Sequence, residues 1–217
     1  MKNIPRIFID DDIKSGMIIP LPRETLHYLT RVMRTDTAIV FGGGHEFSAT
    51  VDNTGKNIVV GPDTGHTDPA NDVVLYFAPI KRTDDLINMA TQMGVKKIVP
   101  VMTEHTTAQH INWERMKKIA TEAAEQSNRN SVPEIAIPIK FTDLDLSNLA
   151  FADERAAYGA QRSGATKIKS ILVGPEGGFS DSEFAALDAA GSVGISLGKT
   201  ILRAELAAAI AISKITE

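Results

Sequence analysis

The hydrophobic positions divide the chain into two stretches with different periodicities. Up to about residue 65, short apolar runs are separated every few positions by turn-forming residues. Such runs predict the strands of a small β-barrel or sandwich, with one helix over residues 22–33. The expected strands cover residues 6–9, 37–41, 46–51 and 57–60. The three glycines at 42–44 lie between two of these strands and no helix follows them, so they predict a hairpin turn rather than a phosphate-binding loop.

The second stretch begins after residues 61–72, which are rich in Gly, Pro and Asp and predict a linker. Beyond it, strands expected at 73–79, 97–101, 149–153, 170–173 and 193–197 alternate with helices expected at 83–93, 112–130, 180–190 and 202–216. This alternation predicts an α/β domain with a largely parallel sheet. We therefore expect a smaller domain over residues 1–70 and an α/β domain over residues 71–217.

Composition and charge narrow the class of protein. Of 217 residues, 43% are hydrophobic and 23% charged, which excludes disordered and fibrous proteins. No apolar run approaches the ~18 residues of a membrane span, and the first residues do not form a signal peptide, so we expect a soluble, cytoplasmic protein without membrane contact. The net charge of −4 argues against wholesale coating of nucleic acid and leaves RNA contacts to individually placed arginines.

Cysteine and metal chemistry are not indicated. The chain contains no cysteine, which excludes disulfides, thiolate nucleophiles and cysteine zinc sites. Glu104, His105 and His110 are close in sequence but lack a helical His-x-x-x-His spacing, so we expect no metal.

The most informative motif is ILVGPEGGFSDSE at residues 171–183. An apolar strand leads into a glycine-rich loop, and Ser180 with Glu183 forms a capping box that starts a helix. Glycines at the carboxyl end of such a strand let the backbone approach a ligand, and Glu176 is expected to be a buried carboxylate within the loop. A tight turn without a ligand explains the same residues, so both interpretations stay open at this point. The dinucleotide and P-loop glycine motifs are absent.

A second motif, LGKTILRAELA, covers residues 197–207. A strand ends at a glycine and a helix begins shortly after it, with Arg203 and Glu205 at its entrance. Glu205 suits the positive end of the helix dipole, whereas Arg203 does not, so Arg203 is expected to have an anionic partner. A structural pair between Arg203 and Glu205 is the alternative.

Two helical faces could contact RNA. Glu122, Gln126 and Arg129 share one face of the helix expected at 112–130, which suits RNA or a partner subunit. His27 and the arginines at 31 and 34 share a face of the helix expected at 22–33 and could meet phosphates. A solvated surface explains either face as well.

Taken together, these segments resemble the ribosomal RNA small subunit methyltransferase E family, a branch of the SPOUT methyltransferases. The resemblance covers almost the whole chain, and six motifs occur in the family's order. They are PRIF at 5–8, HxxxRVMR at 27–34, QMGVKKIVP at 92–100, EAAEQSxRxxVP at 122–133, GPEGG at 174–178 and LGxxILRxE at 197–205. The chain departs from the usual family residues at Gln92, Met93, His105, Lys199, Ala204 and Leu206.

The resemblance implies a fold and a cofactor. It implies a PUA-like β-barrel that binds RNA over residues 1–70 and a SPOUT-type, trefoil-knotted α/β domain over residues 71–217. It also implies S-adenosylmethionine, without a metal, held by three loops at residues 152–154, 174–178 and 197–202. A side chain added at Gly177 is expected to block the cofactor, since glycines leave binding to the backbone. The implied cofactor-binding residues are Ala152, Glu154, Gly174, Pro175, Glu176, Gly177, Gly178, Leu197, Gly198, Ile201 and Leu202.

The implied reaction is methylation of N3 of a uridine in 16S ribosomal RNA of the small subunit. Glu176 is a candidate base, and Arg203 with Glu205 forms the rest of the expected catalytic set, Arg203 stabilising charge on the uracil oxygens. The weak overall charge favours the assembled subunit over naked RNA as substrate. A homodimer is expected through the helices at 112–130 and 202–216, because residues 207–212 are small and apolar all round. RNA contacts are expected from Arg6, His27, Arg31, Arg34, Gln126 and Arg129.

Two other functions stay open. The chain could be a non-catalytic RNA-binding or ribosome-assembly protein, in which Ala204 and Leu206 reflect lost catalysis. It could also be a SPOUT methyltransferase with another RNA target, because the motifs identify the cofactor better than the nucleotide. Binding of S-adenosylmethionine by the purified protein separates the first of these from an enzyme.

Overall fold

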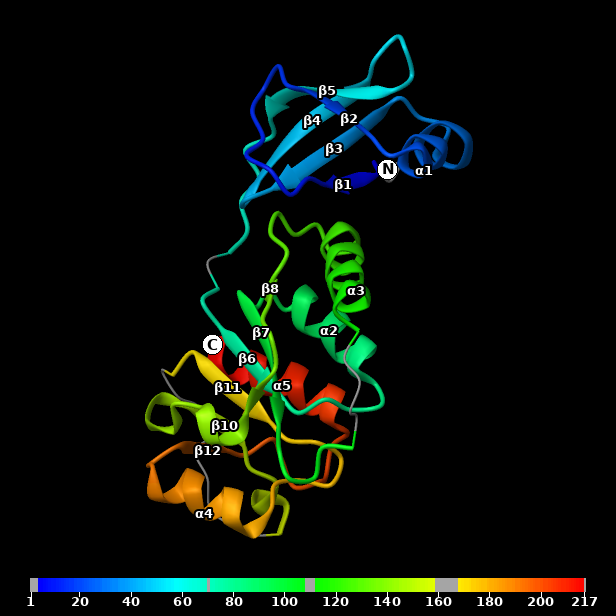
Figure 1. The fold of residues 1–217 in the computed structure, drawn as a ribbon. Helices are drawn as coiled ribbons and strands as arrows, with labels where there is room; N and C mark the ends of the chain where they lie inside the picture. The colour runs from blue at the N-terminus through cyan, green and yellow to red at the C-terminus, as the bar shows by residue number, and fades with distance from the viewer. Residues whose placement is uncertain (1–3, 70, 108–111, 159–167, 217) are drawn as a thin grey trace. The chain divides into compact units, whose positions relative to one another are not determined.

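The structure, a computed structural model of the chain, describes residues 4–69, 71–107, 112–158 and 168–216. The chain divides into two compact units (Figure 1). Unit 1 contains residues 1–69 and 121–132, and unit 2 contains residues 70–120 and 133–217. The hydrophobic pattern gives no indication that residues 121–132 group with the N-terminal segment.

In the described part of unit 1, five strands form one sheet in the order β1-β3-β4-β5-β2. β1 pairs with β3 in parallel, and the other neighbours are antiparallel. Alternate residues of the strands point inward, and Leu29, Val40 and Ile58 at the centre of this core are fully buried. The strands are β1 (Arg6–Phe8), β2 (Ile18–Pro20), β3 (Thr37–Gly42), β4 (His45–Val51) and β5 (Asn57–Asp63).

Most local predictions for this unit are confirmed. The turn between β3 and β4 is a hairpin at Gly43 and Gly44, whose φ values of 60° and 86° favour glycine. The expected helix is α1 (Arg23–His27), followed by a π-type turn over Tyr28–Met33. Strand β2 was not expected, because its three residues show no core-facing alternation and Ile18 is 65% exposed.

In the described part of unit 2, seven strands form a sheet in the order β12-β10-β11-β6-β7-β8, with β9 also beside β7. Every pairing is parallel, which confirms the predicted α/β organisation. The two-residue strands β8 and β9 are too short to leave a hydrophobic pattern. The strands are β6 (Val74–Phe77), β7 (Lys97–Met102), β8 (Glu134–Ile135), β9 (Ile139–Lys140), β10 (Ala150–Ala152), β11 (Ser170–Val173) and β12 (Val193–Ile195).

The helices lie close to their expected positions. They are α2 (Thr83–Gln92), α3 (Trp113–Gln126), α4 (Asp181–Ala189) and α5 (Ala204–Thr216), with short 3-10 turns at Phe141–Asp143, Leu146–Asn148 and Glu154–Tyr158. The predicted capping box starts α4: Ser180 Oγ accepts the Glu183 N–H, and the Glu183 carboxylate accepts the Ser180 N–H. The helix therefore begins where the glycine loop ends.

Helix α5 packs on α2 and on strands β6, β10 and β11 (Figure 1). The small residues Ala208 and Ala211 are at most 1% exposed and let the helix approach the sheet closely, and Ile212 is fully buried. Ala209 and Ile210 in the same stretch are only half-buried, and Leu206 before it is 45% exposed, so the described residues leave part of this apolar helix surface uncovered. A dimer stays a prediction from the family resemblance.

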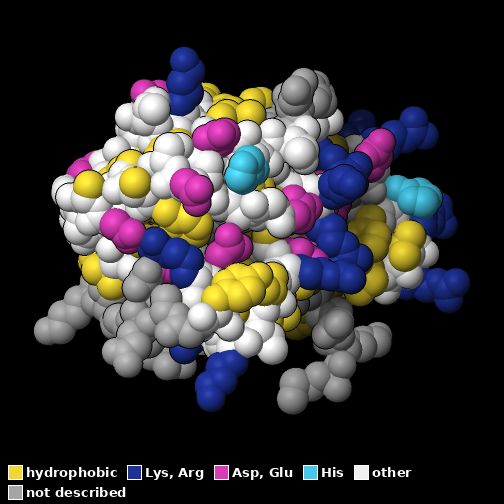
Figure 2. All heavy atoms as spheres, turned by 90° about the horizontal axis from the view of Figure 1, so that it is seen from below, with side chains coloured by type: hydrophobic (Ala, Val, Ile, Leu, Met, Phe, Trp, Pro, Cys, Tyr) yellow, Lys and Arg dark blue, Asp and Glu magenta, His cyan; other side chains and the backbone are white. Residues whose placement is uncertain are grey.

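The surface carries charges of both signs. On the face shown in Figure 2, acidic and basic side chains are interspersed with hydrophobic ones. Within the residues that the structure describes, no helix is both long and apolar enough to cross a membrane.

Candidate active site

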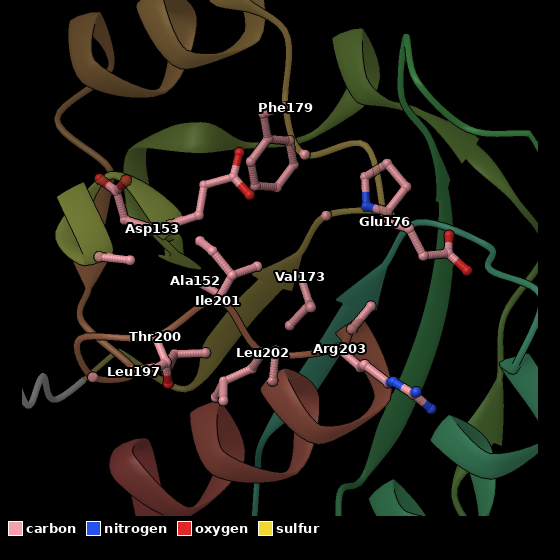
Figure 3. A pocket seen from close by; sticks show the side chains of 18 residues that line it. Ala152, Asp153, Val173, Glu176, Phe179, Leu197, Thr200, Ile201, Leu202 and Arg203 are labelled. Atoms are coloured by element: carbon pink, nitrogen blue, oxygen red, sulfur yellow. The ribbon is translucent and has the colours of Figure 1, made fainter.

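Three loops of unit 2 meet at one edge of the parallel sheet. Strands β12, β10 and β11 are direct neighbours, so their carboxyl ends lie side by side, which is where open α/β sheets usually bind ligands. The loops after these strands and the start of α5 enclose a cavity of about 290 Å³ (Figure 3). Ten of the eleven expected cofactor residues line it, namely Ala152, Glu154, Gly174, Pro175, Glu176, Gly178, Leu197, Gly198, Ile201 and Leu202.

The cavity wall is largely apolar. Phe179 lies at the wall and packs edge-on against Phe151 and Phe184, with ring centroids 6.3 and 5.5 Å apart. Gly174 leaves room for this ring, since a Cβ there would lie 3.2 Å from it. Asp153 and Thr200 belong to the loops expected to hold the cofactor, and both line the cavity. The lining residues that were not expected all lie beside or shortly after the expected loops, and they are Ala157, Val173, Phe179, Ala204 and Ala207.

The two consecutive glycines of the loop have different surroundings. Gly178 lines the cavity with a φ of +71°, and a Cβ there would lie 2.1 Å from Glu154 Oε1. Gly177 does not line the cavity, and its Cβ would instead lie 3.3 Å from the Cβ of His105. Of the two glycines, only Gly178 is placed where an added side chain would change the cavity wall, and Gly177, at which a steric block was expected, is not.

His105 contacts this loop. Its Nδ1 lies 3.1 Å from the carbonyl oxygen of Gly177 and 3.2 Å from that of Gly178. The neighbouring N–H of Glu104 donates to Glu183 Oε1 at 2.9 Å. The segment after β7 is thus tied both to the glycine loop and to the first turn of α4.

Glu176 is exposed, so the expectation of a buried carboxylate is wrong. The loop turns its side chain outward, where Oε1 accepts the backbone N–H of Lys81 at 3.2 Å. In Figure 3 the Glu176 side chain extends away from Val173 and Ile201.

The expected catalytic residues Arg203 and Glu205 are separated. Arg203 lines the cavity and is exposed, and its side chain extends to the same side as Glu176 (Figure 3). Glu205 does not line the cavity; it is buried and pairs with Arg82 Nη1 at 3.2 Å. The alternative of a structural Arg203–Glu205 pair is therefore wrong, and among the described residues the Arg203 side chain has no ion pair or hydrogen bond.

Two adjacent carboxylates at the end of β10 differ in environment. The Asp153 side chain is fully buried, and Arg155 donates to it from Nε at 2.9 Å and from Nη2 at 2.8 Å. Burial of the Glu154 carboxylate raises its pKa, and the charge of Asp153 raises it further, against an opposite effect of His105. At the cavity, the Asp153 carboxylate is therefore paired with an arginine, whereas the Glu154 carboxylate has lost part of its hydration.

Unit 1 contains a basic groove of about 460 Å³ beside α1. His27 and Arg31 line it, as the shared helical face predicts, and Arg34 is exposed nearby in sequence. Arg23 and Lys56 also line the groove. Neither residue was among the expected RNA contacts. Lys56 comes from the turn before β5, far from α1 in the sequence.

Two other arginines expected to contact RNA lie inside unit 1. The Arg6 side chain is 7% exposed, pairs with Glu46, and donates to Asn130 Oδ1 at 2.9 Å. The Arg129 side chain is 13% exposed and pairs with Asp68 at 3.4 Å. The structure thus gives both guanidinium groups an intramolecular role, whereas Gln126, also expected to contact RNA, is exposed.

In the described ranges, no group of three or more His, Cys, Asp or Glu residues could hold a metal ion. His110 lies outside the described residues.

Comparisons with known proteins agree with this geometry. A family model for an RNA methyltransferase domain matches residues 67–216. The chain is 32% identical to ribosomal RNA small subunit methyltransferase E of Rickettsia conorii, covering 97% of this chain and 94% of that protein. It is 28% identical to the protein of the same name from Mesomycoplasma hyopneumoniae, with 96% and 97% covered.

Solved structures show the same fold. A probable rRNA-methyltransferase from Porphyromonas gingivalis superimposes with a TM-score of 0.80 and 28% identity, covering 98% of this chain and 97% of that chain. A ribosomal RNA small subunit methyltransferase E from Neisseria gonorrhoeae, bound to S-adenosyl methionine, gives a TM-score of 0.83 at 24% identity, with 97% and 95% covered. The α/β methyltransferase fold is therefore shared over nearly the whole chain.

Proposed function

The chain belongs to the ribosomal RNA small subunit methyltransferase E family, and we propose that it transfers the methyl group of S-adenosylmethionine to N3 of a uridine in 16S ribosomal RNA. The observation that carries this proposal is the cavity at the carboxyl ends of β12, β10 and β11, which gathers ten residues expected to bind the cofactor. No metal takes part in the proposed reaction.

The residues around the cavity fit S-adenosylmethionine. Gly178 lines the cavity, and the Glu154 carboxylate occupies the position that a side chain there would take, so this part of the wall presents backbone and a carboxylate to a ligand. Val173, Leu197 and Leu202 offer apolar surface for the adenine ring and the aliphatic carbons. The Glu154 carboxylate offers a negative charge to a cationic ligand. When bound, S-adenosylmethionine supplies a methyl group on a positively charged sulfur.

The protein's own part in the reaction is to position the uridine and to handle charge and a proton. As N3 bonds to the methyl carbon, the bond from sulfur to that carbon breaks and the N3–H proton must leave. Glu176 is the proposed acceptor of this proton, because its carboxylate extends to the same side of the cavity rim as Arg203 (Figure 3). Arg203 stabilises negative charge on the uracil oxygens, and Glu205 contributes by holding Arg82 beside the start of α5.

The basic groove of unit 1 is the proposed RNA contact. Arg23, His27, Arg31 and Lys56 line it, and at least three of them carry charge at neutral pH. Arg34 and Gln126 are exposed and supplement it. The net charge of −4 gives weak long-range attraction to RNA, so we propose the assembled small subunit in the cytoplasm as the substrate.

Finer features of the fold and assembly belong to the same proposal. We propose that unit 1 is a PUA-like barrel, that unit 2 contains a trefoil knot, and that the protein is a homodimer. The adjacent positions of the 174–178 and 197–202 loops around one cavity support the knot, and a crystal structure would test it directly. Light scattering at micromolar concentration tests the dimer, and a monomer would contradict it.

Mapping of N3-methyluridine by mass spectrometry in small-subunit RNA, with and without the gene, tests the reaction. We expect one modified uridine to be lost in the deletion strain and restored by purified protein, S-adenosylmethionine and intact subunits. Methylation of a different nucleotide would indicate another RNA target. Absence of both methylation and cofactor binding would leave a non-catalytic RNA-binding protein. Equal methylation of protein-free RNA and intact subunits would contradict the assembled substrate.

A further inference from the structure

The carboxylate of Glu154 lies directly at the cavity wall. Glu154 and Gly178 both line the cavity, although they follow different strands. A Cβ placed on Gly178 would lie 2.1 Å from Glu154 Oε1 and 3.0 Å from Oε2. Both oxygens of the acid therefore lie in the space that a side chain at Gly178 would occupy.

The other two acidic side chains that line the cavity, Asp153 and Glu176, each accept hydrogen bonds from the protein. Asp153 is paired with Arg155, which donates to both of its oxygens. Glu176 extends outward and accepts the Lys81 N–H. Among the described residues, the Glu154 side chain at the cavity wall has no ion pair or hydrogen bond, and of the basic groups His105 lies near enough to lower its pKa.

We propose that Glu154 biases the cavity toward S-adenosylmethionine over S-adenosylhomocysteine, the product that remains after methyl transfer. This inference rests on the proposed function. The two molecules share their adenosine and amino-acid parts, but only the first carries a positive charge on sulfur. A carboxylate at the wall attracts that charge and gains nothing from the neutral thioether of the product. Methyl transfer thus weakens binding and favours product release.

The size of the effect follows from Coulomb's law. Opposite charges about 4 Å apart attract enough to change affinity about fivefold even in a water-like dielectric, and more in a protein cavity. Part of the Glu154 hydration is lost, since burial raises its pKa, so for a sulfur at that distance the attraction exceeds the water-like value. The ratio of the Kd values for the two ligands should report the attraction between Glu154 and the sulfur, because contacts that both ligands make cancel in this ratio.

Calorimetric titration of the purified protein with S-adenosylmethionine and with S-adenosylhomocysteine tests the inference. In Glu154→Gln we expect the Kd of the first to rise at least about fivefold while the Kd of the second stays within about twofold. Glu154→Asp keeps the charge and should retain part of the preference. Glu104→Gln is the matched control, because it removes the same charge from a residue that does not line the cavity, and its Kd ratio should equal that of the wild type.

A pH series adds a second measurement that does not depend on a variant folding well. Protonation of Glu154 should reduce the wild-type preference as the pH falls, beginning above the usual range of a glutamate since its pKa is raised. His105, Asp153 and Arg155 are the other charged or titratable groups nearby, and they remain in Glu154→Gln. The difference between the two pH profiles therefore isolates Glu154.

Three outcomes are distinguishable. If Glu154→Gln weakens both ligands equally, Glu154 serves packing and the inference is overturned. If neither Kd changes, the charge does not reach the ligand and the inference is again overturned. If the wild type binds neither ligand, the proposed function itself fails.

Discussion

Replacing Gly178 by alanine tests how strictly the glycine loop shapes the cavity. At a φ of +71°, an L-residue costs roughly 1–2 kcal/mol relative to glycine. The new Cβ would also lie 2.1 Å from Glu154 Oε1 and 2.9 Å from its carboxyl carbon. These distances are too short for any unstrained contact, so the carboxylate must leave this wall or the loop must shift.

Both responses change the wall that meets the ligand. If the loop relaxes to relieve about 1–2 kcal/mol of strain, re-forming the wall on binding costs the same amount, which is about 5–30-fold in affinity. We therefore expect the Kd of S-adenosylmethionine to rise at least about fivefold in Gly178→Ala. Titration calorimetry at fixed pH and ionic strength measures this change, and thermal melting checks that the variant is folded.

Gly177→Ala is the control from the adjacent position. Gly177 does not have a positive φ, and its Cβ would lie 3.3 Å from His105 Cβ, a distance that a shift of a few tenths of an ångström relieves. We expect its Kd to stay within about twofold of the wild type, since it lies outside the cavity wall. A larger loss of affinity in Gly177→Ala than in Gly178→Ala would refute the assignment of the wall to Gly178.

Three further changes separate chemistry, stability and RNA binding. Arg203→Ala should leave the Kd of S-adenosylmethionine within a few-fold while lowering single-turnover methylation about 10²–10³-fold, and loss of cofactor binding would contradict this role. Arg6→Ala should lower the free energy of unfolding by about 3 kcal/mol in urea titrations, because it leaves the Glu46 carboxylate buried without a cation; a loss below about 1 kcal/mol would be inconsistent with a buried pair. The double variant Arg31→Ala, Lys56→Ala should reduce the slope of log affinity for RNA against log salt by about 1.4–1.8, as two lost phosphate contacts require, and an unchanged slope would exclude the groove from phosphate binding.

The sequence by itself determined the longer strands of unit 2 and the start of α4, but not the two-residue strands β8 and β9. The pattern predicts the strands at β6, β7, β10, β11 and β12 to within about two residues, because each is a short apolar run bounded by turn residues. The start of α4 was predictable for a similar reason, since a capping box lies within four consecutive residues. Local signals of this kind require no knowledge of distant partners.

The meeting of the three loops depends on sheet order, which no local pattern encodes. Strand β10 lies between β11 and β12, both of which follow it in the chain, and this order gathers their loops around one cavity. The resemblance of the motifs indicated which loop residues form the site, but it did not predict where individual side chains point. Glu176 was expected inside and extends outward, while Phe179, which was not among the expected cofactor residues, lines the wall.

Charged groups show most clearly what only the tertiary structure decided. Arg6 and Arg129 resemble surface arginines in the sequence, yet Arg6 pairs with Glu46, 40 residues away, and bonds to Asn130, 124 residues away. Glu205 pairs with Arg82 rather than with the nearby Arg203, across 123 residues. A buried charge requires a partner, and folding can supply that partner from anywhere in the chain, so burial and pairing depend on the packed structure rather than on sequence neighbours.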